Sequence, residues 1–323
     1  MPVRASATTV PTDAGLVELV DTSSFTATAS ANALEGPLAT ATATARTNIS
    51  GRTMALDSTS NTVYILTATG LSVIPLTGAA KSSTPSVSPS GVVNTANFRT
   101  GIAPGGLVSI MGQNLASSAT AGSTPLPIVL GGSCVTLSNT PLPLLATAAG
   151  QINAQIPFTL AAGTYTLVVR SPANQAASAS VSVSVSKYAP AIFVNSNGPA
   201  IYHVNGGQQV DQAHPATRDE PLVIYATGLG VTTGGKVTAG SPSPSSPLAV
   251  TAAVALYFGN PLISNTAVIV NWSGLQPGTM GVYQINCTIP GNHFNGNALP
   301  VTLRIGGVST PTTGANVAVV YVD

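Results

Sequence analysis

Residues Ala179–Ser186 read ASVSVSVS, so that serine and valine alternate without a break. Because successive side chains of a β-strand point to opposite faces of its sheet, this alternation is typical of a strand with one buried face. Helical periodicity is almost absent, and short strands at regular spacing predict β-sandwiches. Five further apolar, β-branched runs are separated by Gly, Pro, Asn and Ser: Gly106–Met111, Thr164–Arg170, Leu222–Tyr225, Ala267–Val270 and Val301–Ile305.

An internal repeat organises the second part of the chain. The sequence QINAQIP at Gln151–Pro157 recurs as QINCTIP at Gln284–Pro290. An apolar segment precedes each copy, at Pro104–Leu115 and at Asp219–Gly230, and a further strand-like run follows each copy. Three elements in the same order at similar spacing predict tandem copies of one β-fold.

Two linker-like stretches set the expected domain boundaries. Lys81–Ser90 (KSSTPSVSPS) is rich in Ser and Pro and is not expected to sustain a strand ladder, and Lys187–Pro190 (KYAP) ends one series of strands. We therefore expect an N-terminal β-rich segment at residues 1–86 and immunoglobulin-like β-sandwiches at 87–189 and 190–323. The predicted fold class is all-β.

The composition excludes several classes of protein. Only 6% of the residues are charged and the net charge is +1, against ~25% charged residues in typical soluble proteins. No basic surface is available for nucleic acid, and no run of about 18 apolar residues could span a membrane as a helix. Surfaces of Thr, Ser, Gly and Ala with few charges suit secreted proteins, so we expect an extracellular or cell-surface location.

Groups for catalysis are scarce. No acidic residue lies between Asp57 and Asp211, and the first histidine is His203, whereas general acid–base chemistry needs a positioned titratable group. The serines and threonines form neither a GxSxG elbow nor an SxxK motif beside a usable base. Cys134 and Cys287 are not spaced as metal ligands; they are compatible with a disulfide or with two buried thiols, and we expect thiols. We predict a protein that is not an enzyme, with no catalytic residues, no cofactor and no metal.

Three polar constellations have a structural and a functional interpretation. The carboxylates of Asp211–Glu220 (DQAHPATRDE) could bind a cation, but a solvated loop in which Arg218 neutralises its neighbours is preferred. Asp57–Asn61 (DSTSN) is better explained as a hairpin turn than as a calcium loop. His203 is expected on a strand surface beside a turn at Asn205–Gly206.

Some residues point to carbohydrate. Trp272 and Tyr283 could stack on a sugar ring, although core or boundary positions are preferred for both. Glycosylation sequons begin at Asn48, Asn271 and Asn286, and they are weak signals in a chain of this composition. The run Ala39–Thr47 has a composition that carries O-glycans in other proteins. Glycans are therefore candidate partners.

Six motifs occur in order within residues 91–323: GVVNTANFRTGIAPGGLVSIMGQNLA, AGQINAQIPF, APAIFVNSNGPAIYHVNG, PLVIYATGLG, SSPLA and YQINCTIP. With these motifs, this part of the chain resembles the C-terminal region of uncharacterised secreted proteins of Acidobacteria of the Solibacter type. The resemblance implies paired immunoglobulin-like modules without known catalysis, often behind a β-propeller.

The N-terminal segment resembles only part of a propeller. Arg52–Leu76 (RTMALDSTSNTVYILTATGLSVIPL) resembles the closing strands of one blade, whereas a closed propeller needs at least about four blades. Its strands are therefore expected to pair elsewhere, for example with another copy of the chain.

Two main functions follow from the sequence. The first is a structural subunit that assembles with itself into an extracellular filament or layer through the N-terminal strands. The alternative is an adhesin-like or carbohydrate-binding tail module of a larger secreted protein. A hydrolase would require a pocket with a paired acid or histidine.

Overall fold

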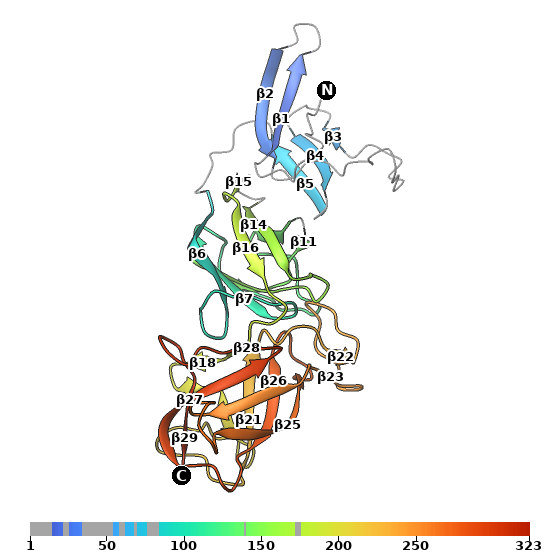
Figure 1. Ribbon diagram of the computed structural model, residues 1–323. Coiled ribbons are helices and arrows are strands. Elements are labelled where there is room, and N and C mark those ends of the chain that lie inside the picture. Colours follow the sequence, from blue (N-terminus) through green and yellow to red (C-terminus); the bar gives the residue numbers. More distant parts are fainter. Residues whose placement is uncertain are drawn as a thin grey trace.

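The computed structural model describes residues 15–21, 26–33, 54–57, 62–67, 70–75, 84–138, 140–171 and 176–323. All the regular elements in these ranges are β-strands, and they form several sheets (Figure 1). The fold class is therefore all-β, as the alternating sequence predicts. Nothing in the described ranges forms a helix long and apolar enough to cross a membrane.

The N-terminal part holds a hairpin and a three-stranded antiparallel sheet. The hairpin pairs β1 (Gly15–Asp21) with β2 (Thr26–Ala33), and the sheet has the order β3 (Met54–Leu56), β4 (Thr62–Thr67), β5 (Gly70–Pro75). A small core joins the two and contains the buried side chains of Val17, Val63, Ile65 and Ile74. Most of the turn predicted at Asp57–Asn61 lies outside the described residues.

The strands from β6 to β16 form a sandwich of two sheets, here called the first module. One sheet has the order β6 (Ser86–Asn94), β7 (Leu107–Gln113), β13 (Gln151–Gln155), β12 (Leu144–Thr147), β8 (Ala119–Thr120). The other contains β9 (Val129–Leu130), β10 (Ser133–Leu137), β11 (Thr140–Pro141), β14 (Gly163–Ser171), β15 (Ala176–Ala177) and β16 (Val181–Val185). Both sheets contribute to one core, in which Ile110 and Ile152 belong to the first sheet and Val135 and Leu167 to the second.

The expectation that Lys81–Ser90 cannot join a strand ladder is wrong for its last residues. β6 begins at Ser86, and Ser86 and Val87 pair with Gln113 and Gly112 of β7. The register then shifts before Val92, and Ser90 has a φ of 55°. Pro89 is tolerated because it falls in this bulge on an edge strand, where no ladder hydrogen bond is required from it.

The strands from β17 to β29, here called the second module, surround a separate core. A two-stranded sheet pairs β18 (Val194–Asn195) with β19 (Gly198–Pro199). The main path of the large sheet is β17 (Ala191–Ile192), β21 (Pro221–Thr227), β26 (Tyr283–Thr288), β25 (Ala267–Leu275), β24 (Val254–Phe258), β27 (Gly296–Ile305), β28 (Val308–Ser309). Joined to this path are β20 (Ile201–His203), β22 (Thr233–Gly234), β23 (Ala249–Val250) and β29 (Val319–Val322).

β25 lets the large sheet enclose its core. Its first residues, Ala267 and Val268, pair with β24, whereas the residues from Ile269 onward pair with β26. One continuous strand therefore passes from one layer to the other, and the core between the layers includes Ile285 of β26 and Leu303 of β27.

The repeated QIN strands hold equivalent positions in the two modules. Ile152 pairs with Ile110 in the first module, and its counterpart Ile285 pairs with Ile224 in the second. The strand that follows each copy, β14 or β27, lies in the other layer and pairs with β10 or β24. We propose the division of the chain at residues 1–86, 87–189 and 190–323.

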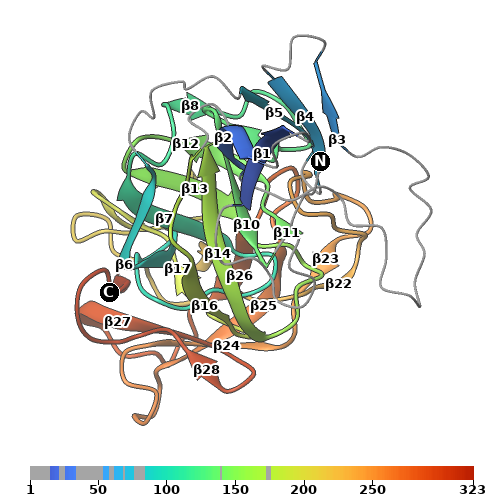
Figure 2. The ribbon, with the colours of Figure 1, turned by 90° about the horizontal axis from the view of Figure 1, so that it is seen from above.

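The parts follow one another along the molecule, with the C-terminus at the far end of the second module (Figure 1). Seen along that direction, the sheets of the successive parts overlap (Figure 2). Hydrogen bonds join the modules: the Leu107 N–H donates to Thr227 Oγ1 over 2.9 Å, and Asn316 Nδ2 donates to the Asn97 carbonyl over 3.0 Å. Arg99 reaches the Ala315 carbonyl near the C-terminus.

Candidate functional site

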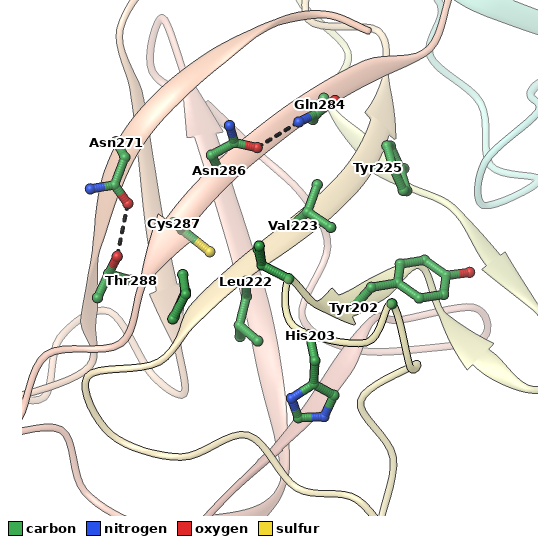
Figure 3. A pocket seen from close by; sticks show the side chains of 13 residues that line it. Tyr202, His203, Leu222, Val223, Tyr225, Asn271, Gln284, Asn286, Cys287 and Thr288 are labelled. Atoms are coloured by element: carbon green, nitrogen blue, oxygen red, sulfur yellow. Dashed lines mark hydrogen bonds between the residues drawn. The ribbon is translucent and has the colours of Figure 1, made fainter.

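An open groove of about 800 Å³ lies on the second module, over β20, β21, β25 and β26 (Figure 3). Side chains in these strands alternate between the core and the groove, since Ile285 and Cys287 are buried whereas Gln284 and Asn286 are partly exposed. The polar and aromatic side chains that line the groove are Tyr202, His203, Tyr225, Asn271, Gln284, Asn286 and Thr288.

Strand register places one row of residues straight across this face. Trp272 of β25 pairs with Asn286 of β26, Asn286 pairs with Val223 of β21, and Val223 pairs with Tyr202 of β20. Directly opposed residues of antiparallel strands lie on the same face of a sheet. The row therefore has an aromatic residue at each end, with an amide and a small aliphatic residue between them.

A bulge in β25 sets the position of Trp272. Val270 pairs with Cys287 and Trp272 pairs with Asn286, so Asn271 is an extra residue on this strand. The indole ring lies over Gly274, because a Cβ added there would be 2.5 Å from Cζ2 of Trp272. The partly exposed indole ring thus occupies the space that a side chain at position 274 would fill.

The side-chain amides of the groove make only some of the hydrogen bonds that they are able to make. Gln284 Nε2 donates to Asn286 Oδ1 over 2.7 Å, and Thr288 Oγ1 donates to Asn271 Oδ1 over 2.9 Å (Figure 3). Gln284 Oε1, Asn286 Nδ2 and Asn271 Nδ2 make no hydrogen bond to the part of the chain that the structure describes. One acceptor and two donors are therefore available in a partly apolar groove.

Two tyrosines form the wall on the β20 side. The ring centroids of Tyr202 and Tyr225 lie 5.9 Å apart with an interplanar angle of 57°. This tilted arrangement is one that aromatic pairs favour, and it holds both rings in defined orientations.

His203 connects the groove to the loop at residues 211–220. Its Nδ1 lies 2.5 Å from Glu220 Oε1, and Glu220 Oε2 accepts a hydrogen bond from the Thr217 N–H over 2.8 Å. Partial burial raises the pKa of Glu220, but the hydrogen bonds from His203 and Thr217 outweigh it, so this pKa lies below its usual value. The His203 side chain is only 13% exposed, so the expected strand-surface position is not what the structure shows, and its pairing with Glu220 was not predicted. A histidine paired with an acid beside a groove is the feature that a hydrolase would require, but Nε2 of His203 is engaged as well, by the His214 carbonyl over 3.3 Å.

The carboxylates of the loop at residues 211–220 do not lie together. Asp211 Oδ1 accepts from the backbone N–H groups of Ala213 and His214, whereas Glu220 faces His203. Arg218 donates to Asn295 Oδ1 over 2.8 Å, so the expectation that it neutralises its neighbours is not what the contacts show. Within the described ranges, no three His, Cys, Asp or Glu residues come together as a metal site.

The other residues that the sequence singled out lie in the core, along the groove or outside the described residues. Tyr283 is 0% exposed and its hydroxyl donates to the Gly230 carbonyl over 2.6 Å, so it is a core residue and not a sugar-stacking one. Of the sequon asparagines, Asn271 and Asn286 line the groove, whereas Asn48 lies outside the described residues. Cys134 and Cys287 are buried thiols in different modules, and burial raises the pKa of Cys287 to about 12.

Sequence reasoning named Trp272 as a possible sugar-stacking residue and Asn271 and Asn286 only as sequons, and it missed Tyr202, Tyr225 and Gln284. The alternation of QINCTIP already places Gln284 and Asn286 on one face of a strand. The tyrosines could be added only with the strand register, because β20, β21 and β25 are separated along the chain.

Comparisons with known proteins give weak similarities. No protein-family model matches the chain, and no curated protein matches it. The chain is similar to a Bacteroides ovatus mixed-linkage glucan utilization locus protein, SGBP-B, solved with a mixed-linkage heptasaccharide: 11% identity and a TM-score of 0.31, over 81% of this chain and 52% of that one. It thus spans about half the length of that protein.

Two other solved structures are similar at a comparable level. The BSP domain of a biofilm associated protein has 14% identity and a TM-score of 0.25, over 73% of this chain and 29% of that one. The Escherichia coli adhesin FdeC has 14% identity and a TM-score of 0.19, over 81% of this chain and 74% of that one. The function proposed below rests on the groove and not on these similarities.

Proposed function

We propose that this chain is a non-enzymatic extracellular protein whose second module binds carbohydrate in the groove over β20, β21, β25 and β26. One observation carries the proposal: Tyr202 and Tyr225 line the groove beside Gln284 and Asn286, whose amides retain unused hydrogen-bonding groups. Trp272 does not line the groove itself, but its pairing with Asn286 places it on the same face, at the edge of the groove. Sparse charge and the resemblance of residues 91–323 to secreted proteins support the extracellular location.

The chemistry of this face matches that of a sugar. A pyranose has an apolar C–H face and a rim of hydroxyl groups that both donate and accept hydrogen bonds. Aromatic rings supply large, rigid apolar surface with a polar tip, and amides supply a donor and an acceptor on one short side chain. Groups of this kind, set in a largely apolar concave surface, are those that fix the orientation of a small ligand.

Removal of single aromatic residues tests the proposal. Affinity electrophoresis in gels that contain soluble polysaccharides, followed by titration calorimetry, compares the full chain with Tyr225→Ala and Trp272→Ala. Each loss should weaken binding about tenfold, equivalent to about 1.4 kcal/mol. Tyr257→Ala is the matched control, because Tyr257 is also partly exposed but lies on β24, away from the groove. Failure of every polysaccharide to retard the full chain would overturn the proposal.

A second candidate function is self-assembly through the N-terminal sheet. One face of β4 and β5 exposes Tyr64, Leu66, Leu71 and Val73, and Leu71 is 64% exposed. Val73 pairs with Tyr64 and Leu71 with Leu66, so these four side chains form a contiguous apolar surface. Among the described residues β3 and β5 are also the edges of their sheet. A surface of this kind, beside unpaired strand edges, favours association with another copy of the chain.

Sedimentation and negative-stain microscopy test this second function. Deletion of residues 1–80 removes β1 to β5 and leaves every strand of both modules, because β6 begins at Ser86. The truncated protein should be monomeric, and assemblies of the full chain should persist at high salt because few charges are involved. Leu71→Glu should act like the deletion, whereas Leu262→Glu, at a position 93% exposed in the second module, should not. A full-length protein that is monomeric, or an assembly that survives the deletion, would exclude this function.

A further inference from the structure

Building on the proposed carbohydrate binding, we infer that the groove takes a neutral, extended oligosaccharide. The sugar chain crosses the strands from Trp272 to Tyr202. Between these ends, the amides of Gln284 and Asn286 form hydrogen bonds with neighbouring hydroxyl groups of the sugar. No metal ion takes part. Three features of the groove carry this inference: the length of the row, the hydrogen-bonding groups at its centre and the absence of a cation along its lining.

The row sets the length and direction of the ligand. Trp272 and Tyr202 are cross-strand neighbours at the two ends of a row over four strands. Three strand spacings separate them, which is roughly 14 Å. A single pyranose cannot contact both aromatic residues at that separation, whereas a short oligosaccharide can. Because the row runs straight across the strands, an extended chain can follow it from one aromatic residue to the other.

The amide pair supplies complementary groups to a vicinal diol. Gln284 Nε2 donates to Asn286 Oδ1, which leaves Gln284 Oε1 as an acceptor and Asn286 Nδ2 as a donor. If both amides were rotated by 180°, the pair would still leave one donor and one acceptor. Since a hydroxyl group both donates and accepts, two adjacent hydroxyls can satisfy the pair in either orientation.

The charges near the groove favour a neutral sugar. His203 is the one ionisable base among the lining residues, and the Glu220 carboxylate already lies 2.5 Å from its Nδ1. No lysine or arginine lines the groove. Recognition of sugar carboxylates or sulfates relies on such cations or on a bound metal, and the described residues gather no set of metal ligands.

The first module is an internal contrast to this site. Its equivalent row is Ala146, Asn153, Ser109 and Val93, with no aromatic residue at either end. Asn153 Oδ1 also accepts hydrogen bonds from both Gln151 and Ser109. The same amide pair is therefore kept in both repeats, but only the second repeat leaves it between aromatic side chains. Asn153 is the matched control for Asn286.

Titration calorimetry of the full chain with defined sugars tests the inference. The probes are cello-, laminari- and manno-oligosaccharides of one to six units and oligogalacturonides of the same lengths. For at least one neutral series, affinity should rise with length to about four units and then level off. Trp272→Ala should lose about tenfold in affinity for the tetramer but little for the dimer. Asn286→Ala should lose binding at all lengths and Asn153→Ala should not, and EDTA should have no effect.

The outcomes separate this inference from the proposed function. Tighter binding of the oligogalacturonides, full affinity for a monosaccharide, or loss of binding in EDTA would overturn the inference while carbohydrate binding stands. Equal losses for Asn153→Ala and Asn286→Ala would overturn the assignment of the groove. Lack of binding to all the sugars and to the soluble polysaccharides would overturn both. Circular dichroism melts of each variant identify any loss that arises from unfolding.

Discussion

Gln155 of the first module accepts a 2.7 Å hydrogen bond through Oε1 from the backbone N–H of Gly240 in the second module. Its Nε2 donates to the Gly105 carbonyl over 3.1 Å, and the side chain is 1% exposed. Close by, Thr227 Oγ1 accepts from the Leu107 N–H and donates to the Gly281 carbonyl. Breaking the hydrogen bonds that cross the junction would leave buried polar groups without partners, so these bonds favour one relative placement of the two modules.

Replacement of Gln155 by leucine should destabilise the protein. The variant leaves the Gly240 N–H and the Gly105 carbonyl without partners in a buried place, and each such group costs ~1–3 kcal/mol. Urea unfolding of this variant should show a lower midpoint than that of the wild type. The decrease should be largest in a transition in which both modules unfold together. Gln151→Leu is the control, because the Gln151 amide is partly exposed and bonds only within the first module. Equal effects of the two substitutions would contradict the role of Gln155 in the junction.

Alkaline pH should destabilise the second module through Cys287 and Tyr283. Burial raises the pKa of Cys287 to about 12 and raises that of Tyr283 above its usual value. The unfolded thiol has a pKa of about 8.5, so above that pH the unfolded chain releases a proton that the folded protein retains. The free energy of unfolding should therefore fall as the pH rises from about 9 toward 12.

Thermal melts of the wild type and Cys287→Ala measure this effect. Alanine is the residue that the first repeat has at the equivalent position, Ala154. The variant should be less stable at neutral pH because it leaves a small cavity, but its stability should decline less steeply above pH 9. Parallel pH profiles of the two proteins would contradict the contribution of the thiol.

The fold could be predicted from the sequence further than the site. Alternation in ASVSVSVS and QINCTIP identifies strands and their buried faces, because each of these strands has one polar and one apolar side. The sequence failed at Ser86–Ser90, where composition suggested a linker but a bulge lets Pro89 lie in an edge strand. Local composition does not reveal which strand is at an edge, because that depends on pairing with distant β7.

The groove required information that no single segment contains. Trp272 was a candidate from residue type alone, but so was Tyr283, and only burial distinguishes them. Tyr202, Asn286 and Trp272 come together through the pairing of β20, β21, β26 and β25, and the bulge at Asn271 decides which face Trp272 occupies. Register between strands that are distant in sequence is set by core packing, and alternation alone does not give it.

Acid should loosen the loop at residues 211–220 through Glu220. Hydrogen bonds from His203 and Thr217 overcome the effect of partial burial and hold the pKa of Glu220 below its usual value. The stabilisation by the carboxylate is therefore present above the usual glutamate pKa and is lost as the pH falls through the lowered value. Limited proteolysis between pH 3 and 7 should show faster cleavage in this loop at the acid end.

Glu220→Gln tests the origin of this acid sensitivity. The variant keeps the shape of the side chain but removes its charge, so cleavage of the loop should already be faster at pH 7 and should change less with pH. Asp323→Asn, at the exposed C-terminal residue, is a control for a carboxylate outside the loop. An unchanged acid profile in Glu220→Gln would show that other groups control the loop.

Glycine substitutions should separate backbone strain from steric contact at the junction. Gly228 has a φ of +77°, and a Cβ added there would lie 2.0 Å from the Ala189 carbonyl oxygen. Gly207 has a φ of +66° with nothing within 4 Å of an added Cβ, and Gly122 has open space without a positive φ. An alanine at position 228 would therefore meet both backbone strain and a clash with the backbone. An alanine at position 207 would meet strain alone, and an alanine at position 122 would meet neither.

The stability of the three alanine variants should increase from Gly228→Ala through Gly207→Ala to Gly122→Ala. Gly122→Ala should be neutral or slightly stabilising, because it reduces the entropy of the unfolded chain. Gly207→Ala should lose about 1–2 kcal/mol, the cost of a left-handed conformation for a residue with a Cβ. Gly228→Ala should lose more than Gly207→Ala, because the Ala189 backbone must also move, and with it the hydrogen bond from Asn94 to the Ala189 carbonyl. Urea unfolding measures all three, and a Gly228→Ala variant no less stable than Gly207→Ala would show that the modules can separate at this point without cost.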